Sequence, residues 1–415
     1  MRAFFSYFLS QVPVQILSFV TGLLLIRYMD KSEYGWYTLA SSAIIMMVMF
    51  TDLGVGSGIS ALGGRYYENR KRLSQIFSAA HIQRKKLMIL SSLLGYPYLV
   101  YVLIENKMPL SGIVMISILG LLTQIAQIQS QIFRGVFTIL LKTKWVITED
   151  IITALARCVL IVGLIPFWLK VESVLIVQLV VLCGVLFLQC RWGKSVVDNN
   201  EQARSEDVNF FRLLIYRQGP STIYYSLAGQ LNFLLLTIFG TIGKVAELGA
   251  LTKLFVILRG LEQAMAVIIA PRFSRCLDRR KLLIFLGGVV AALIVFSICF
   301  IGGVFMFNHF ILRILGPEYT QMEDALNWMA LSVCISFSNM SISKMNKAKG
   351  WIIPPIPFIG VQIIFYAVMI CFLDLSLLVS VILLTIFNQG LVLSINILWS
   401  LRKIHEFDSC EKITG

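Results

Sequence analysis

Residues 173–190 read SVLIVQLVVLCGVLFLQC, a stretch without a single charged side chain that is followed at once by Arg191. An uncharged apolar run of this length is long enough to cross the hydrocarbon core of a bilayer as a helix. The apolar residues are continuous and do not alternate with polar ones, which favours a helix over a strand of a membrane barrel. This stretch therefore predicts a transmembrane helix, and the rest of the chain can be compared with it.

Eleven other stretches resemble it. The composition allows for them, because 58% of the 415 residues are hydrophobic and only 14% are charged, against about 25% in an ordinary soluble domain. The sequence predicts an all-α integral membrane protein with twelve transmembrane helices. The predicted spans are 4–26, 36–62, 87–104, 110–133, 146–168, 173–190, 220–242, 248–270, 282–305, 325–343, 352–374 and 377–399.

The Lys and Arg residues predict the orientation. With the N-terminus inside, 27 of the 36 fall in segments on the cytoplasmic side, so both termini are expected in the cytoplasm. The net charge of +14 is then mostly this asymmetry, which points to an anionic lipid surface and to no nucleic acid. The basic stretch Lys71–Lys86 suits a short helix lying on the inner leaflet, and the alternative is a basic extension of the third span.

The longest polar segment, 191–219, divides the chain into two sets of six helices. We expect an N-terminal half at 1–190, a cytoplasmic linker at 191–219, a C-terminal half at 220–399 and a cytoplasmic tail at 400–415. A shift of 214 positions places Glu33 on Glu247 and Gly35 on Gly249, a weak sign of a repeat. Two halves of six helices have the same topology, an arrangement typical of transporters with a central cavity between the halves.

Several classes of site are not indicated. The eight Cys are scattered through apolar stretches and the three His are isolated, so neither a metal nor another cofactor is expected. No outward loop is long enough for a sizeable catalytic domain, and no nucleophile with a nearby base appears, so we expect no enzyme. Gly54 and Gly58 have the spacing of a close helix contact, which is a better explanation than a phosphate loop.

Charges inside the predicted spans are the candidate functional residues. Arg157 and Arg259 each lie in the middle of a span, where a charge costs about 2.5–3.5 kcal/mol unless a partner or a water-filled cavity keeps it. Each has a structural alternative, a pair with Asp150 for Arg157 and with Glu262 for Arg259. With Lys253 and Arg27, nearer the outer side, these arginines are the predicted substrate-binding residues of the central cavity. The ion-coupling candidates are the four acidic residues in or near spans, namely Asp52, Glu149, Asp150 and Glu262.

Three short motifs carry a family resemblance. They are Arg27-Tyr-Met-Asp-Lys-Ser-Glu-Tyr-Gly-Trp-Tyr37, Pro271-Arg-Phe-Ser-Arg275 and Leu315-Gly-Pro-Glu-Tyr319. In this order, with twelve spans and a middle linker, the chain resembles the Wzx-type O-antigen flippases of the multidrug/oligosaccharidyl-lipid/polysaccharide exporter (MOP) superfamily.

The resemblance implies a protein of the bacterial inner membrane that moves an undecaprenyl-pyrophosphate-linked oligosaccharide from the inner to the outer leaflet. It also implies a cationic cavity, ion-driven alternating access with a proton or sodium as the coupling ion, and a glycan polymerase as a partner. Two alternatives are a cation-coupled exporter of small drugs and a membrane enzyme of the glycan pathway.

Overall fold

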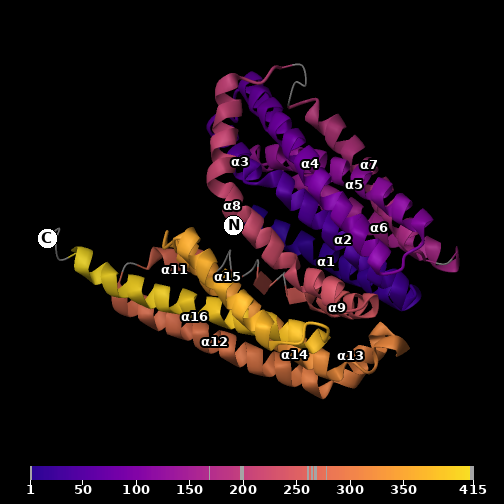
Figure 1. Ribbon diagram of the computed structural model, residues 1–415. Coiled ribbons are helices and arrows are strands. Elements are labelled where there is room, and N and C mark those ends of the chain that lie inside the picture. Colours follow the sequence, from indigo (N-terminus) through magenta and orange to yellow (C-terminus); the bar gives the residue numbers. More distant parts are fainter. Residues whose placement is uncertain are drawn as a thin grey trace. The chain divides into compact units, whose positions relative to one another are not determined.

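The computed structural model describes residues 2–167, 169–196, 201–258, 261–262, 265, 269–276 and 278–411. Within these ranges the chain is almost entirely helical and contains no strand (Figure 1). The elements are α1 (Arg2–Tyr28), α2 (Lys31–Asp52), α3 (Val55–Arg65), α4 (Arg70–Glu105), α5 (Leu110–Ile139), α6 (Thr143–Leu164), η1 (Ile165–Phe167), α7 (Val171–Gly193), α8 (Ser205–Phe239), α9 (Ile242–Leu254), η2 (Phe255–Ile257), α11 (Ala270–Arg275), α12 (Arg279–Met306), α13 (Asn308–Leu315), η4 (Pro317–Tyr319), α14 (Glu323–Ala348), α15 (Pro355–Phe372) and α16 (Leu378–Glu411).

Eleven helices in these ranges are long and apolar enough to cross a membrane. The prediction of an all-α, multi-pass membrane protein is therefore confirmed, and the count of twelve spans is approximate. The predicted span 248–270 is the one without a counterpart, because part of it lies outside the described residues. α9, η2 and α11 are the described elements around it.

Three predicted boundaries were wrong. The span 36–62 is two helices, because the backbone turns sharply at Leu53 and Gly54, whose φ angles are 31° and 93°. The basic stretch 71–86 is not a separate surface helix but the first part of α4, so the alternative of an extended third span is correct. The segment 191–219 is not a long loop, since α8 already begins at Ser205.

The described chain forms two compact units, residues 1–246 and 247–415. In the first unit, α5 packs on α7, α1 on α6, and α2 on both α4 and α8. In the second unit, α14 packs on α16 and α12. The predicted division into two six-helix halves around residues 191–219 stays a prediction.

Gly58 allows one of the tightest contacts in the first unit. A Cβ atom at this position would lie 2.6 Å from the ring of Phe211 and 2.8 Å from Leu214, both on α8. Phe211 is fully buried, in a core to which Ile59 on α3, Ile76 on α4 and Ile132 on α5 also belong. The predicted close helix contact at the glycine run is therefore confirmed for Gly58.

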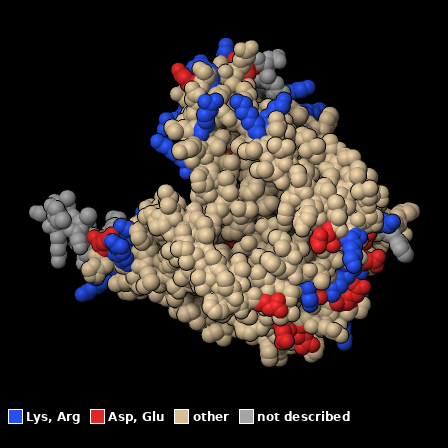
Figure 2. Space-filling view, in the orientation of Figure 1, with Lys and Arg blue, Asp and Glu red and all other residues tan. Residues whose placement is uncertain are grey.

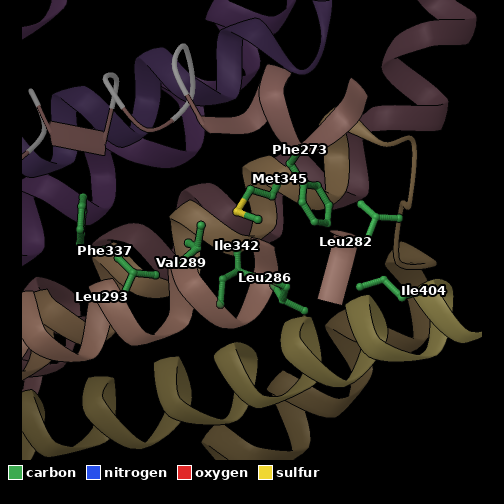
Figure 3. Close-up of a cluster of buried hydrophobic side chains, with 9 residues drawn as sticks. All are labelled: Phe273, Leu282, Leu286, Val289, Leu293, Phe337, Ile342, Met345 and Ile404. Carbon is green, nitrogen blue, oxygen red and sulfur yellow. The ribbon is translucent and has the colours of Figure 1, made fainter. Parts of the chain in front are cut away.

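The core of the second unit is apolar at one level and polar at another. Figure 3 shows the apolar cluster, which joins α11, α12, α14 and α16 through side chains such as Phe273, Leu286, Ile342 and Ile404. The polar level lies between α14 and α16, where Asn396 donates to Oδ1 of Asn339 at 2.8 Å. These side-chain contacts hold α14 and α16 together at two levels.

Charged side chains are concentrated at helix ends. In the space-filling view, the middle of the first unit is mostly uncharged, and Lys and Arg gather where α4 and α8 begin (Figure 2). An uncharged belt with a basic end is the surface expected of a protein that crosses a bilayer.

Candidate functional site

Helix α6 carries three of the predicted site residues, Glu149, Asp150 and Arg157. Seven residues separate Asp150 from Arg157, which corresponds to about 10 Å along a helix axis. The charges of α6 therefore form two separate groups, and the two groups have different partners.

The first group is centred on Arg134, at the end of α5. Its guanidinium donates to both oxygens of Asp150, at 2.6 and 3.0 Å, and Nη1 lies 3.4 Å from Oε1 of Glu149. Gln11 on α1 adds a hydrogen bond of 2.9 Å from Nε2 to Asp150 Oδ2. Side chains from three helices thus meet at one acidic pair, and Asp150 is held by a bidentate contact, the strongest kind of ion pair.

Glu149 is less well satisfied than Asp150. Its side chain is only 6% exposed, and Gln189 on α7 lies beside it. Oε2 of Glu149 and Oε1 of Gln189 are both buried, and neither has a hydrogen-bond donor among the described residues. Since buried acceptors without donors are costly, this corner of the site lacks one hydrogen.

The second group pairs Arg157 with a tyrosine. Nη2 of Arg157 donates to the Tyr37 hydroxyl of α2 at 2.7 Å, and its buried Nε has no partner within the described ranges. The alternative in which Asp150 pairs with Arg157 was wrong, because Asp150 is bound to Arg134 and Gln11. In the described part of the chain, this half-buried arginine therefore faces no carboxylate.

Two other predicted residues of the first unit lie apart from α6. Asp52, at the end of α2, forms an ion pair with Arg84 of α4 and accepts a hydrogen bond from the Gly56 amide at 3.0 Å. Arg27 is exposed in the last turn of α1. The structure thus brings neither of them to the two groups on α6.

The second unit contains the remaining predictions. Lys253 is half-buried in α9. Arg259 lies outside the described residues, so its predicted pair with Glu262 does too. The backbone carbonyl of Glu262 accepts a hydrogen bond from Lys344 Nζ at 3.0 Å.

Sequence reasoning missed Arg134, Gln11 and Tyr37 as site residues. Arg134 was assigned to a cytoplasmic segment, because the apolar count of its span ended at 133, whereas α5 continues to Ile139. The apolar residues Val136 and Phe137 are the signal that the helix continues, and both are buried. No sequence signal connects Gln11 with Asp150, which lie 139 positions apart.

The first motif of the family resemblance is a joint between helices. Glu33 Oε2 accepts from the Val171 amide at the start of α7 (2.9 Å), and Trp36 Nε1 donates to the Asn106 carbonyl (3.3 Å). At Gly35 an added Cβ would lie 2.6 Å from the backbone oxygen of Ile242. This motif therefore connects the first turns of α2 to three other segments, while Tyr37 at its end orients Arg157.

No metal centre is present in the described ranges, where no three His, Cys, Asp or Glu side chains come together. The charges of the site are instead arginines and carboxylates on helices that are long and apolar enough to cross a membrane.

The fold is that of MOP superfamily transporters. The lipid II flippase MurJ in an inward closed conformation matches with a TM-score of 0.74 at 14% identity, covering 97% of this chain and 87% of that chain. An inward-facing multidrug resistance MATE family transporter matches with a TM-score of 0.72 at 12% identity, covering 95% of both chains. A MOP superfamily transporter from Pyrococcus furiosus matches with a TM-score of 0.64 at 13% identity, covering 97% of this chain and 94% of that chain.

The sequence itself identifies the family. Residues 1–277 match the family described as "Polysaccharide biosynthesis protein", so the chain belongs to that family. None of the curated proteins matches it. The resemblance expected from the three motifs is thereby confirmed, and the structures that the chain resembles are those of transporters and a flippase, not enzymes.

Proposed function

We propose that the protein is a flippase that moves an undecaprenyl-pyrophosphate-linked oligosaccharide, such as an O-antigen repeat unit, from the inner to the outer leaflet of the bacterial inner membrane. The observation that carries this proposal is Arg157, a mid-span cation whose one partner in the described ranges is a neutral hydroxyl. A guanidinium that is not neutralised by a carboxylate is available to a phosphate group. Membership in a polysaccharide biosynthesis family supplies the kind of lipid that would carry that phosphate.

In this mechanism Arg157 binds the pyrophosphate while the polyprenyl chain stays in the lipid. Tyr37 holds the guanidinium through Nη2, so that the remaining N–H groups point to the substrate. Lys253 and Arg259 are further substrate-binding residues in this proposal, and Arg27 receives the head group at the outer end of α1. The sugars follow through a hydrated path, because they cannot cross hydrocarbon at low cost.

Glu149 is the ion-coupling residue in this proposal, and the ion is a proton. A proton on Oε2 supplies the hydrogen that the corner formed with Gln189 lacks, and it leaves Arg134 and Asp150 as a neutral pair. Release of this proton from Glu149 leaves two carboxylates beside Arg134, so the net charge of the group becomes negative. Asp52 and Asp150 are weaker candidates, since an arginine lies closer to each of them than the 3.4 Å between Arg134 and Glu149, and Glu262 is a further candidate.

The orientation and partners follow from the same proposal. Both termini lie in the cytoplasm, and a glycan polymerase takes up the flipped unit on the outer side. A reporter fused after Glu105 or Glu172 is expected outside the membrane, and one fused after Arg204 or Arg402 inside. A linker reporter found outside would contradict the orientation.

The decisive experiment is deletion of the gene, followed by measurement of surface glycan and of the leaflet in which lipid-linked units accumulate. Wild-type protein should restore export, Arg157→Lys partly, and well-expressed Arg157→Ala not at all. Arg65→Ala, which changes the exposed arginine at the last position of α3, is the matched control. Normal surface glycan in the deletion strain together with drug sensitivity would favour the drug exporter, and glycosyl transfer by the pure protein would favour an enzyme.

The coupling step is tested with Glu149→Gln, which keeps the shape of the side chain but cannot release a proton. We expect normal abundance and export that no longer responds to the proton gradient. Glu105→Gln, at an exposed position, should behave as wild type. Unchanged gradient dependence in Glu149→Gln would exclude Glu149 as the proton carrier.

A further inference from the structure

A polar pocket opens on the first unit between α4, α5 and α7. Its volume is about 330 Å³, and polar side chains from α4 and α5 line it, among them Ser78, His81 and Gln129. Ile82 and Cys190 are the exposed residues of its lining. The pocket belongs to a single compact unit, so it exists independently of any movement between the two units.

Among the polar side chains of this pocket, Ser74 donates to the Arg70 carbonyl at 2.8 Å, whereas three others have no hydrogen bond in the described chain. Ser78, His81 and Gln129 form no hydrogen bond to any group in the part of the chain that the structure describes. Together they offer a hydroxyl, an imidazole and an amide, groups that both donate and accept. Because these half-buried groups are not used by the protein, they are available to a polar ligand that both accepts and donates hydrogen bonds.

The surroundings of the pocket vary along α4 in a definite order. Lys85 lies one helical turn after His81, on the same side of the helix, and its side chain is exposed. One and two turns farther along this face, Ile89 and Leu93 are 60% and 70% exposed. A polar pocket, then a cation, then an apolar strip matches the order of groups in a phospholipid, from its polar head group and phosphate to its acyl chains.

The expected depth of the pocket in the membrane also fits a phospholipid. The pocket residues of α4 lie between two basic clusters, Arg70–Arg72 and Arg84–Lys86, and precede the apolar part of the helix. By the positive-inside rule, this is the head-group region of the inner leaflet, where anionic lipids concentrate.

We propose that this pocket binds the phosphodiester head group of an anionic phospholipid from the inner leaflet. Ser78, His81 and Gln129 hydrogen-bond the head group, Lys85 balances its charge, and one acyl chain lies along Ile89 and Leu93. The occupant is a bulk phospholipid and not the glycan carrier, because a volume of about 330 Å³ lies at the lower end for small-molecule pockets and leaves no room for an oligosaccharide.

The test uses the full chain, purified in a mild detergent and titrated with phosphatidylglycerol or phosphatidylcholine, with bound lipid counted by native mass spectrometry. Wild type should bind phosphatidylglycerol at least tenfold more tightly than phosphatidylcholine. Lys85→Ala should lose most of this preference, and so should His81→Leu. Lys86→Ala is the matched control, because it removes the neighbouring charge, about 100° round the helix from Lys85.

Further arms separate the possible sources of the phosphate. Inorganic phosphate should neither bind measurably nor displace phosphatidylglycerol, because it has no acyl chain. Equal binding of the two phospholipids, or an unchanged preference in Lys85→Ala, would overturn the proposal. Displacement of phosphatidylglycerol by a polyprenyl diphosphate at equal concentration, lost in Lys85→Ala, would also overturn it and assign the pocket to the transport substrate. Since Lys85 is exposed, its variant should fold even if His81→Leu does not.

Discussion

Arg72 and Asp207 form a bidentate ion pair, with Nη1 and Nη2 of the guanidinium 2.6 and 2.7 Å from the two carboxylate oxygens, although 135 positions separate the residues. The pair joins the first turn of α4 to the first turn of α8. The Asp207 side chain is 3% exposed and that of Arg72 13%. The polar start of α8 is thus anchored inside the first unit.

Arg72→Ala should destabilise the protein strongly. The substitution leaves the Asp207 carboxylate buried without its cation, a change that typically costs about 3–5 kcal/mol. We expect a clearly lower midpoint of thermal unfolding in detergent. Lys71→Ala is the control, because Lys71 is 72% exposed, lies 3.6 Å from Glu201 and should contribute at most about 1 kcal/mol. Equal midpoints for the two variants would contradict the importance of the buried pair.

Gly58→Ala should be destabilising although alanine favours helices. Its Cβ would lie 2.6 Å from Phe211, a ring that is fully buried and has little room to move. Overpacking of this kind costs about 1–3 kcal/mol. Gly64→Ala, in the same helix and with no atom within 4 Å of the new Cβ, should be neutral or stabilising by up to about 1 kcal/mol. Thermal midpoints of the two variants give the comparison, and a Gly58→Ala protein as stable as wild type would show that α8 can shift.

Tyr37→Phe should weaken export without lowering protein abundance. Phenylalanine fills the buried site of Tyr37, but Arg157 loses the hydroxyl that orients it. We expect substrate affinity to fall about tenfold, equivalent to about 1.4 kcal/mol, with a smaller loss of export than in Arg157→Ala. The measurement is export per amount of membrane-inserted protein. A fall in abundance that accounts for all the lost export would mean that the Tyr37–Arg157 contact is structural.

Asn396→Leu should loosen the pair of helices α14 and α16. Asn396 donates to Asn339, and Asn339 donates in turn to Gln389 at 2.7 Å, so the substitution interrupts a connected set of amides, of which Asn339 and Asn396 are buried. Contacts of this type between membrane helices are worth about 0.6–1.7 kcal/mol. Ser394→Ala is the control, since Ser394 is exposed and bonds only to the Gly390 carbonyl of its own helix. The prediction fails if both variants unfold at the wild-type temperature.

The membrane class and most helices could be predicted, because a helix that crosses the hydrocarbon of a bilayer needs a long run of apolar residues. The positions at which a helix ends inside such an apolar run could not be predicted. Apart from Thr51 and Asp52, the stretches on both sides of Leu53 and Gly54 are mostly apolar, so the hydropathy of the predicted span does not reveal the turn that the backbone angles show. The converse error occurs around Asp207, where the charges suggested a solvated loop. α8 already begins at Ser205, and its Asp207 is buried in an ion pair with Arg72.

The sequence predicted which charged residues belong to the candidate site, but not which residues they contact. Hydropathy marks Arg157 and Glu149 as unusual, because each is an ionisable group inside an apolar run. Which group each one meets depends on how α1, α2 and α5 pack against α6, and nothing local in the sequence encodes this. Asp150 was therefore paired in prediction with Arg157 on its own helix, when Arg134 of the preceding helix holds it.

The joint made by Glu33, Gly35 and Trp36 has a bearing on how such proteins are classified. These residues contact backbone atoms of other segments, namely the Val171 amide, the Ile242 oxygen and the Asn106 carbonyl. Backbone atoms are the same whatever side chains surround them, so the joint places no demand on the cargo. Grouping proteins by this motif would collect a shared scaffold, and, under the proposed function, a classification by cargo would start from the residues around Arg157.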